Sequence, residues 1–164
     1  MKKKLFTLIV SVLALFAAII NKTEYKLPSV NNGNLIRVAD GDTILVRGES
    51  GEIRLRLYGI DAPELNQNYG ATSKKALQKM LSAGTIEYTI IETDQYGRGV
   101  ALVKTEALDI NRQMILEGHA WFYTRHCILN FCDEWRELEQ EAQKGKKGLW
   151  QSNTPTPPWK HRNN

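Results

Sequence analysis

The sequence has little net charge, and this shortage limits what its composition can indicate. Its 22 basic and 18 acidic residues give a formal charge of +4, and three of the positive charges are Lys2, Lys3 and Lys4, so the remainder sums to only +1. Nucleic-acid binding needs positive charge gathered on one face, which so small a total does not indicate. With 164 residues and no visible internal repeat, the chain is also short for two ordinary domains, so one domain should carry the function.

Cysteine is scarce as well, since Cys127 and Cys132 are the only two. In an exported protein a pair this close in sequence predicts a local disulfide, worth about 2 kcal/mol for so short a loop. His119 and His126 lie nearby, so a Cys/His zinc site is an alternative. Because His126 and Cys127 are adjacent and the usual paired ligand spacing is missing, we favour the disulfide.

Only one long apolar run is present, at residues 5–20 directly behind the three lysines. This order predicts that residues 1–20 are a signal peptide or an N-terminal membrane anchor. As a helix the run would reach about 24 Å against a hydrocarbon core of roughly 30 Å, which favours cleavage over a permanent span. We therefore expect an exported protein that is secreted, periplasmic or membrane-anchored outside the cytoplasm, with residues 21–33 as a polar linker.

The apolar pattern of the remaining chain predicts five strands and three helices. Strands are expected at residues 35–39, 43–47, 53–58, 86–92 and 100–105, and helices at 71–83, at 110–117 with Asp109 as its cap, and around Trp135, Leu138 and Ala142 up to Gly145. Three strands, a helix, two strands and trailing helices match an α+β fold built on a five-stranded OB-fold β-barrel. We place this domain at residues 34–150, followed by an extended, proline-rich tail at residues 151–164.

Two acidic clusters and two arginines stand out at the predicted strand ends. The clusters are residues 40–43 and 61–64, Arg56 lies on a strand between them, and Arg98 lies in a glycine-rich loop. Each feature alone is explained by a turn or a solvated side chain. In combination they suit phosphoryl chemistry, because a phosphodiester under attack gains negative charge that carboxylate-bound Ca²⁺ or Mg²⁺ and arginine forks can stabilise.

The segments from Val38 to Thr43, from Arg54 to Glu64 and from Asp94 to Gly99 resemble the staphylococcal nuclease (thermonuclease) family. Asn111-Arg112 and residues 117–120 and 147–150 also fit that family, so the likeness covers nearly all of residues 34–150. The resemblance implies calcium as the cofactor. It implies that Asp42 and Asp61 ligate the ion together with the main-chain carbonyl of Ala62, while water fills the other positions.

The resemblance also implies that Arg56, Glu64 and Arg98 are the catalytic residues. In that assignment Arg56 bridges the metal-bound phosphate and the transition state, and Arg98 stabilises the developing charge and the leaving oxygen. Glu64 positions or activates the attacking water. Asp40 would sit beside the metal, whereas Arg54 has no counterpart among the family's catalytic residues and is assigned to the surface.

Three departures from the best-known member of the family concern a metal ligand and the substrate contacts. Ala62 replaces a threonine, which matters little if only its backbone oxygen binds metal, and the loop at residues 65–70 is shorter. Tyr96 matches a nucleotide-contacting tyrosine, but a second such tyrosine aligns with Thr124, next to Tyr123. For the run Trp121-Phe122-Tyr123 we favour ordinary core packing.

The function expected from the sequence is a calcium-dependent endonuclease that hydrolyses phosphodiester bonds of DNA and RNA and leaves 3′-phosphate ends. We expect it to act as a monomer, and the apolar run would supply any attachment to a membrane. A non-catalytic nucleic-acid-binding module of the same fold is the alternative, but it should have lost carboxylates or arginines that are all present here. A glycosidase with paired carboxylates is a further alternative, against which the arginines count.

Overall fold

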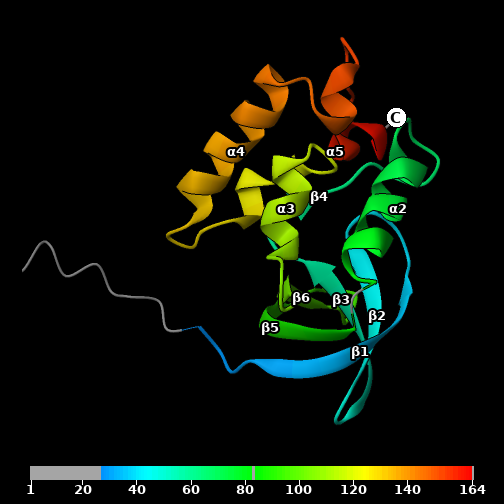
Figure 1. The fold of residues 1–164 in the computed structure, drawn as a ribbon, viewed down its shortest axis with the longest axis vertical. Helices are drawn as coiled ribbons and strands as arrows, with labels where there is room; N and C mark the ends of the chain where they lie inside the picture. The colour runs from blue at the N-terminus through cyan, green and yellow to red at the C-terminus, as the bar shows by residue number, and fades with distance from the viewer. Residues whose placement is uncertain (1–26, 83, 164) are drawn as a thin grey trace, which may run out of the picture.

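Five strands close into a β-barrel, seen in the lower part of Figure 1. The computed structural model describes residues 27–82 and 84–163. The strands of the barrel are β1 (Asn31–Val38), β2 (Thr43–Gly48), β3 (Gly51–Leu57), β5 (Thr85–Thr93) and β6 (Gly99–Lys104). Their order is β1-β2-β3-β6-β5; β3 and β6 are parallel, and β1 pairs with β5 to close the barrel. The predicted OB-fold barrel of an α+β protein is therefore confirmed.

The helices gather at one end of the barrel, above it in Figure 1. They are α2 (Gly70–Met80), α3 (Ile110–Leu116), α4 (Cys132–Lys144) and α5 (Pro158–His161), with 3₁₀ turns η1 (Thr124–His126) and η2 (Gly148–Gln151). A separate two-stranded sheet pairs β4 (Ile60–Asp61), which leads from β3 to α2, with β7 (Trp121–Phe122), which follows α3. Asp109 caps α3, as predicted, since its side chain accepts a hydrogen bond from the main-chain N–H of Arg112 at 3.1 Å.

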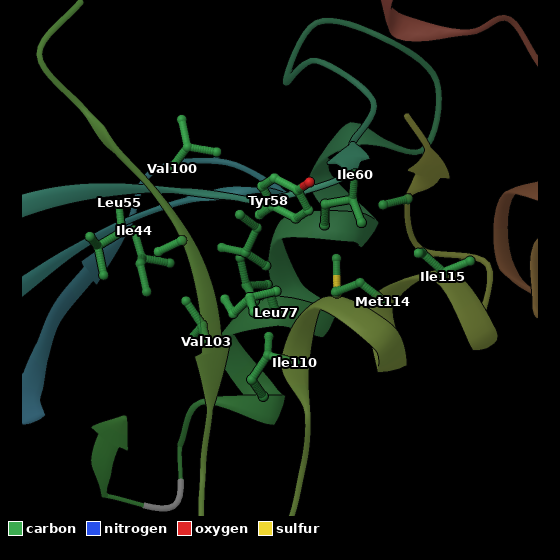
Figure 2. Packing of buried hydrophobic residues seen from close by; sticks show 14 of the residues in the cluster. Ile44, Leu55, Tyr58, Ile60, Leu77, Val100, Val103, Ile110, Met114 and Ile115 are labelled. Carbon is green, nitrogen blue, oxygen red and sulfur yellow. The ribbon is translucent and has the colours of Figure 1, made fainter. Parts of the chain in front are cut away.

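The hydrophobic core joins the barrel to its helices. Ile44 and Leu55 of the barrel, Leu77 of α2, and Ile110 and Met114 of α3 are all 0% exposed. Figure 2 shows these side chains meeting between the strands and the two helices. Since burial of each such side chain stabilises the fold by roughly 1.5–3 kcal/mol, this junction fixes α2 and α3 against the barrel end that carries the acidic turns.

The buried side chain of Asn111 makes the main polar connection in this core. Its Nδ2 donates to the carbonyls of Tyr58 and Ala101 at 2.9 and 3.0 Å, and its Oδ1 accepts from the N–H of Val103 at 2.9 Å. These three bonds tie α3 to β6 and to the chain segment that follows β3. Since Asn111 is 0% exposed, no solvent competes for them.

Both ends of the folded region differ from the sequence-based expectation. β1 begins at Asn31, so residues 31–33, assigned to the polar linker, pair with β5 instead. Their polar pattern does not predict a strand. Their strand conformation comes from pairing with β5, which lies more than fifty residues away in the sequence. At the other end, α5 is a short helix in the segment predicted to be an extended tail.

Cys127 and Cys132 form a disulfide, with their Cα atoms 5.7 Å apart. The predicted pairing is therefore confirmed, and neither cysteine is left as a thiolate ligand for the alternative zinc site. The bond links the segment after η1 to the first residue of α4. Both residues are buried against the core.

The expected signal peptide or anchor at residues 1–20 lies outside the described residues. Within residues 27–82 and 84–163, no helix combines the length and the apolar character needed to cross a membrane.

Candidate functional site

The first acidic group is presented by the tight turn between β1 and β2. The main-chain N–H groups of Ala39 and Asp40 both donate to the carbonyl of Thr43, and the N–H of Asp42 donates to Oδ1 of Asp40 at 3.0 Å. Local hydrogen bonding of this kind is what short acidic side chains supply in turns. The turn leaves the Asp42 side chain 9% exposed and directed into the interior of the site.

The second acidic group, Asp61, comes from β4 and is 0% exposed. The N–H of the next residue, Ala62, donates to Oδ2 of Asp42 at 2.7 Å, which joins the two acidic segments directly. Gly41 permits this approach, since a Cβ there would lie 2.6 Å from the Cβ of Ala62 and 2.1 Å from Oγ of Ser73. The backbone of Ala62 therefore lies beside both carboxylates.

Arg56 lies between these two carboxylates. Its Nη2 donates to Oδ1 of Asp61 at 2.8 Å, and its Nη1 forms an ion pair with Asp42. Burial of the guanidinium opposes its charge, but Asp42 and Asp61 outweigh this and raise the pKa of Arg56 above its ordinary value. Nη1 is fully buried beside Asp42, so the two aspartates together hold the guanidinium in a fixed position.

The acidic groups raise one another's proton affinity. Burial and the neighbouring Asp42 raise the pKa of Asp40 to about 6. Burial also raises the pKa of Asp61, while a hydrogen bond from Arg162 and the charge of Arg56 act in the opposite direction. Carboxylates crowded in this way favour the approach of a cation.

Arg98 enters the site from the loop between β5 and β6. Oδ1 of Asp94 accepts from the N–H groups of Tyr96 and Arg98 at 2.9 and 3.0 Å, and Oδ2 accepts from Nε of Arg98 at 2.7 Å. Desolvation raises the pKa of Asp94, but these hydrogen bonds outweigh it, so the pKa lies below its ordinary value. The guanidinium of Arg98 also lies 5.5 Å from the centre of the Tyr96 ring.

Glu64 follows β4 and has a side chain that is 35% exposed. Its Oε1 accepts a hydrogen bond of 2.6 Å from Nη1 of Arg162. The same guanidinium donates to both carboxylate oxygens of Asp61. A residue from the C-terminal segment is therefore part of the site.

All of the predicted site residues line one cleft of about 850 Å³. They are Asp42, Arg56, Asp61, Ala62, Glu64 and Arg98. Asp40 lines the cleft as well, and so does Arg54, whose side chain is exposed as expected. The fold thus brings together segments separated by more than fifty residues.

The donor set suits a hard divalent cation. Two carboxylates and a main-chain carbonyl offer oxygen ligands, which calcium and magnesium prefer. Among the residues that the structure describes, no three or more His, Cys, Asp and Glu side chains gather as a metal site. Any ion held by Asp42, Asp61 and Ala62 would consequently complete its coordination with water and substrate oxygens.

The aromatic residues near the cleft differ in their surroundings. Tyr96 is 72% exposed and free to stack on a base, as its match to a nucleotide-contacting tyrosine suggests. Phe122 is core, as expected, with 3% exposed. Tyr123 is half-buried and lines the cleft, where Trp159 stacks on it with ring centres 5.5 Å apart.

The sequence-based assignment missed Asp94 and Arg162. Asp94 was recognised as part of a matching segment, but its grip on Arg98 depends on loop geometry that spacing does not encode. Arg162 lay in the presumed tail. The available signal was Trp159, a large apolar side chain among prolines and polar residues, which would be unusual in a solvated segment.

Comparison with known proteins gives a matching family. The sequence model of the family described as "Staphylococcal nuclease homologue" matches residues 54–152. This range contains Arg56, Asp61, Glu64 and Arg98 of the cleft.

Three relatives illustrate the likeness. An "Uncharacterized endonuclease" of Escherichia coli O157:H7 is 36% identical over 129 residues, which is 78% of this chain and 82% of that protein. A "Micrococcal nuclease" of Shigella flexneri is 34% identical over 139 residues, 79% of each chain. The "Probable staphylococcal-like nuclease CAN1" of Oryza sativa subsp. japonica is 36% identical over 124 residues, 76% of this chain but 35% of that longer protein.

Proposed function

This chain belongs to the staphylococcal nuclease homologue family, and we propose that it is a calcium-dependent endonuclease acting on DNA and RNA. Its family and its nuclease relatives make it a nuclease that hydrolyses phosphodiester bonds. Calcium, the range of substrates and the nature of the products are parts of the proposal. The observation that supports them best is the convergence of two carboxylates and two arginines on one cleft.

Calcium would be held by Asp42, Asp61 and the carbonyl of Ala62. The two carboxylates approach closely enough to contact the same guanidinium, and the hydrogen bond from Ala62 to Asp42 places the third ligand beside them. When bound, the ion supplies positive charge that polarises the phosphodiester and stabilises the charge that develops on it. The crowded carboxylates would also be stabilised by its charge.

The two arginines would bind the phosphate from different sides. Arg56 is held by Asp42 and Asp61, and Arg98 is held on the β5–β6 hairpin by Asp94. Guanidinium groups donate paired hydrogen bonds to phosphate oxygens and stay charged at any working pH. Donors fixed before substrate arrives stabilise the transition state without reorganisation.

Glu64 would position the attacking water. Its carboxylate follows the ligand-bearing strand β4 by three residues and is partly exposed to the cleft. As the water oxygen bonds to phosphorus, its proton passes to the carboxylate or to solvent. The bond from phosphorus to the 5′-oxygen breaks, and that oxygen takes a proton from solvent and leaves as the 5′-hydroxyl. The phosphate then remains on the 3′-oxygen, as the family resemblance implies.

A metal-dependence assay tests this proposal. We expect calcium to activate cutting of single-stranded DNA, double-stranded DNA and RNA by the full chain, and a calcium chelator to abolish it. End analysis of the products should show 3′-phosphates. Closed circular DNA, which has no ends, should also be cut. Undiminished cutting in chelator would remove the calcium assignment, and linear-end digestion alone would remove the endonuclease assignment.

Arg56→Ala serves as the matched test of the site. Loss of one transition-state donor costs about 10²–10³ in turnover in comparable sites. Arg47→Ala, an exposed arginine of the neighbouring strand β2 that does not line the cleft, is the control that should retain normal activity. Equal activity of the two variants would show that the phosphate lies elsewhere.

We further propose that the protein is exported. The disulfide between Cys127 and Cys132 supports this, since such bonds persist in oxidising compartments and are rare in the cytosol. Thiol titration of unfolded protein taken from its native compartment should find no free thiol. Two titratable thiols would contradict the proposal.

A further inference from the structure

The C-terminal segment folds back onto the catalytic face of the barrel. In Figure 1 the red segment around α5 lies beside the chain that leads from β4 into α2. Pro158 is buried, and Trp159 packs on Trp121 and Tyr123 with ring centres 5.6 and 5.5 Å apart. Trp159 is half-buried by these ring contacts, which hold the segment against the barrel.

The same segment is bonded to the loop that carries Glu64. Nε2 of Gln67 donates to the carbonyl of Thr156, and Nε2 of His161 lies 3.2 Å from Oδ1 of Asn66. Within that loop, the N–H of Glu64 donates to Oε1 of Gln67 at 3.2 Å. The loop and α5 therefore support each other, and the position of Glu64 depends on both.

Arg162, directly after α5, connects this segment to the catalytic carboxylates. Its Nη1 donates to Glu64 at 2.6 Å and to Oδ1 of Asp61 at 3.2 Å, while Nη2 donates to Oδ2 of Asp61 at 2.8 Å. The planar fork thus bridges two carboxylates that would otherwise repel each other.

This fork contacts one of the two expected carboxylate ligands of calcium, Asp61, and not the other. Arg56 contacts both Asp42 and Asp61. In the described part of the chain, Arg162 forms no hydrogen bond or ion pair with Asp42. It bridges Asp61 to Glu64 instead and shares Oδ1 of Asp61 with Nη2 of Arg56, so it aligns these two carboxylates and leaves Asp42 to Arg56.

We propose that Arg162 is a positioning residue of the nuclease site, which holds Glu64 in line with the metal ligand Asp61. The inference rests on the proposed function. Glu64 is partly exposed and lies on a loop, so without a partner its carboxylate would rotate among several rotamers. Arg162 restricts it to the orientation in which it can direct water toward the phosphorus.

The test compares Arg162→Ala, Arg162→Lys and Lys160→Ala with the wild type in the full chain, with single-stranded DNA and calcium titrated up to saturation. Removing a group that orients a catalytic ligand costs about 10–100-fold in activity. We expect Arg162→Ala to lose that factor in kcat with little change in KM, and Arg162→Lys to recover part of it. Lys160 is the matched control, because it is an exposed cation on α5 without an ion pair among the described residues.

Each outcome bears on the proposal. Normal kcat in Arg162→Ala would overturn the proposal, because the ion pairs of Arg162 with Asp61 and Glu64 would then have no effect on catalysis. A faster Arg162→Ala with a lower calcium requirement would also overturn it, because Arg162 would then be a latch that competes with the ion. A loss in Arg162→Ala that Arg162→Lys does not relieve at all, together with a lowered thermal midpoint, would indicate a merely structural role. If the wild type itself ignores calcium, the proposed function fails first; if the wild type responds, only the role of Arg162 is at stake.

Discussion

At the scale of single residues, Arg98 is arranged before any substrate binds. Asp94 accepts hydrogen bonds from the guanidinium and from two main-chain N–H groups of the same loop. The carboxylate therefore shapes the loop and aims the side chain together. A long arginine side chain that is already ordered loses less conformational entropy when it engages a phosphate.

Asp94→Ala should lower kcat by about 10–100-fold, because a group that orients a catalytic side chain has effects of this size. The loop is at the surface, so the thermal midpoint should change little. Steady-state kinetics on DNA, with Glu106→Ala as an exposed acidic control, would measure the effect. If kcat stays normal, Arg98 does not depend on Asp94 for its orientation.

The sequence predicted the site residues that are defined by short segments, and it missed those defined by approach in space. Asp42, Arg56, Asp61, Glu64 and Arg98 all lie in the three matching segments, and the structure gathers them in one cleft. Arg162 reaches Asp61 across 101 positions of sequence through the docking of Trp159. No local pattern encodes a contact of that range.

At the scale of elements, one buried amide joins α3 to the barrel by hydrogen bonds, in addition to the hydrophobic contacts of the helix. Asn111 satisfies two carbonyls and one N–H that belong to β6 and to the segment after β3. All of these groups are shielded from water. The residue thus links α3 to the place where the parallel pairing of β3 and β6 ends.

Asn111→Ala should lower the free energy of unfolding by roughly 3 kcal/mol, because buried main-chain groups would lose their partners. Asp109→Ala, which removes only the partly buried cap of the same helix, should cost about 1 kcal/mol. Urea denaturation of both variants beside the wild type measures the difference. Equal costs would show that water replaces the amide.

The boundaries of elements were predicted best where side chains alternate. β3 carries Leu55 and Leu57 on the core face and its arginines on the other face, and its observed bounds differ from the prediction by two residues at one end and one at the other. The predicted start of β1 was wrong because Asn31, Asn32 and Gly33 acquire their strand conformation by pairing with β5. In such segments the partner strand, and not the side-chain pattern, determines the structure.

At the scale of the whole molecule, acid should weaken the fold through His119. The ring bonds to Tyr69 and Glu117, and burial lowers its pKa below 6.5 although Glu117 acts in the opposite direction. As the pH falls below about 6.5, the unfolded chain takes up a proton that the folded chain does not bind. The stability contributed by neutral His119 is present above that pH and is lost as the pH falls through the lowered pKa.

Denaturant unfolding of the wild type and His119→Gln at about pH 7.5 and pH 5.5 tests this behaviour. The wild type should lose more stability than the variant on acidification. Asp40, whose pKa is raised to about 6, contributes in the opposite sense, since its stabilisation declines as the pH rises toward that value. It is common to both proteins and cancels in the comparison, so parallel losses would exclude His119 as the cause.

The parallel pairing of β3 with β6 also has a kinetic consequence. Arg56 pairs with Val100, two residues beyond Arg98, so the two arginines become neighbours only when this ladder forms. Contacts between distant strands form slowly compared with helices. During refolding from denaturant, the recovery of catalytic turnover will therefore report when β3 pairs with β6. The circular dichroism signal of the helices will recover earlier.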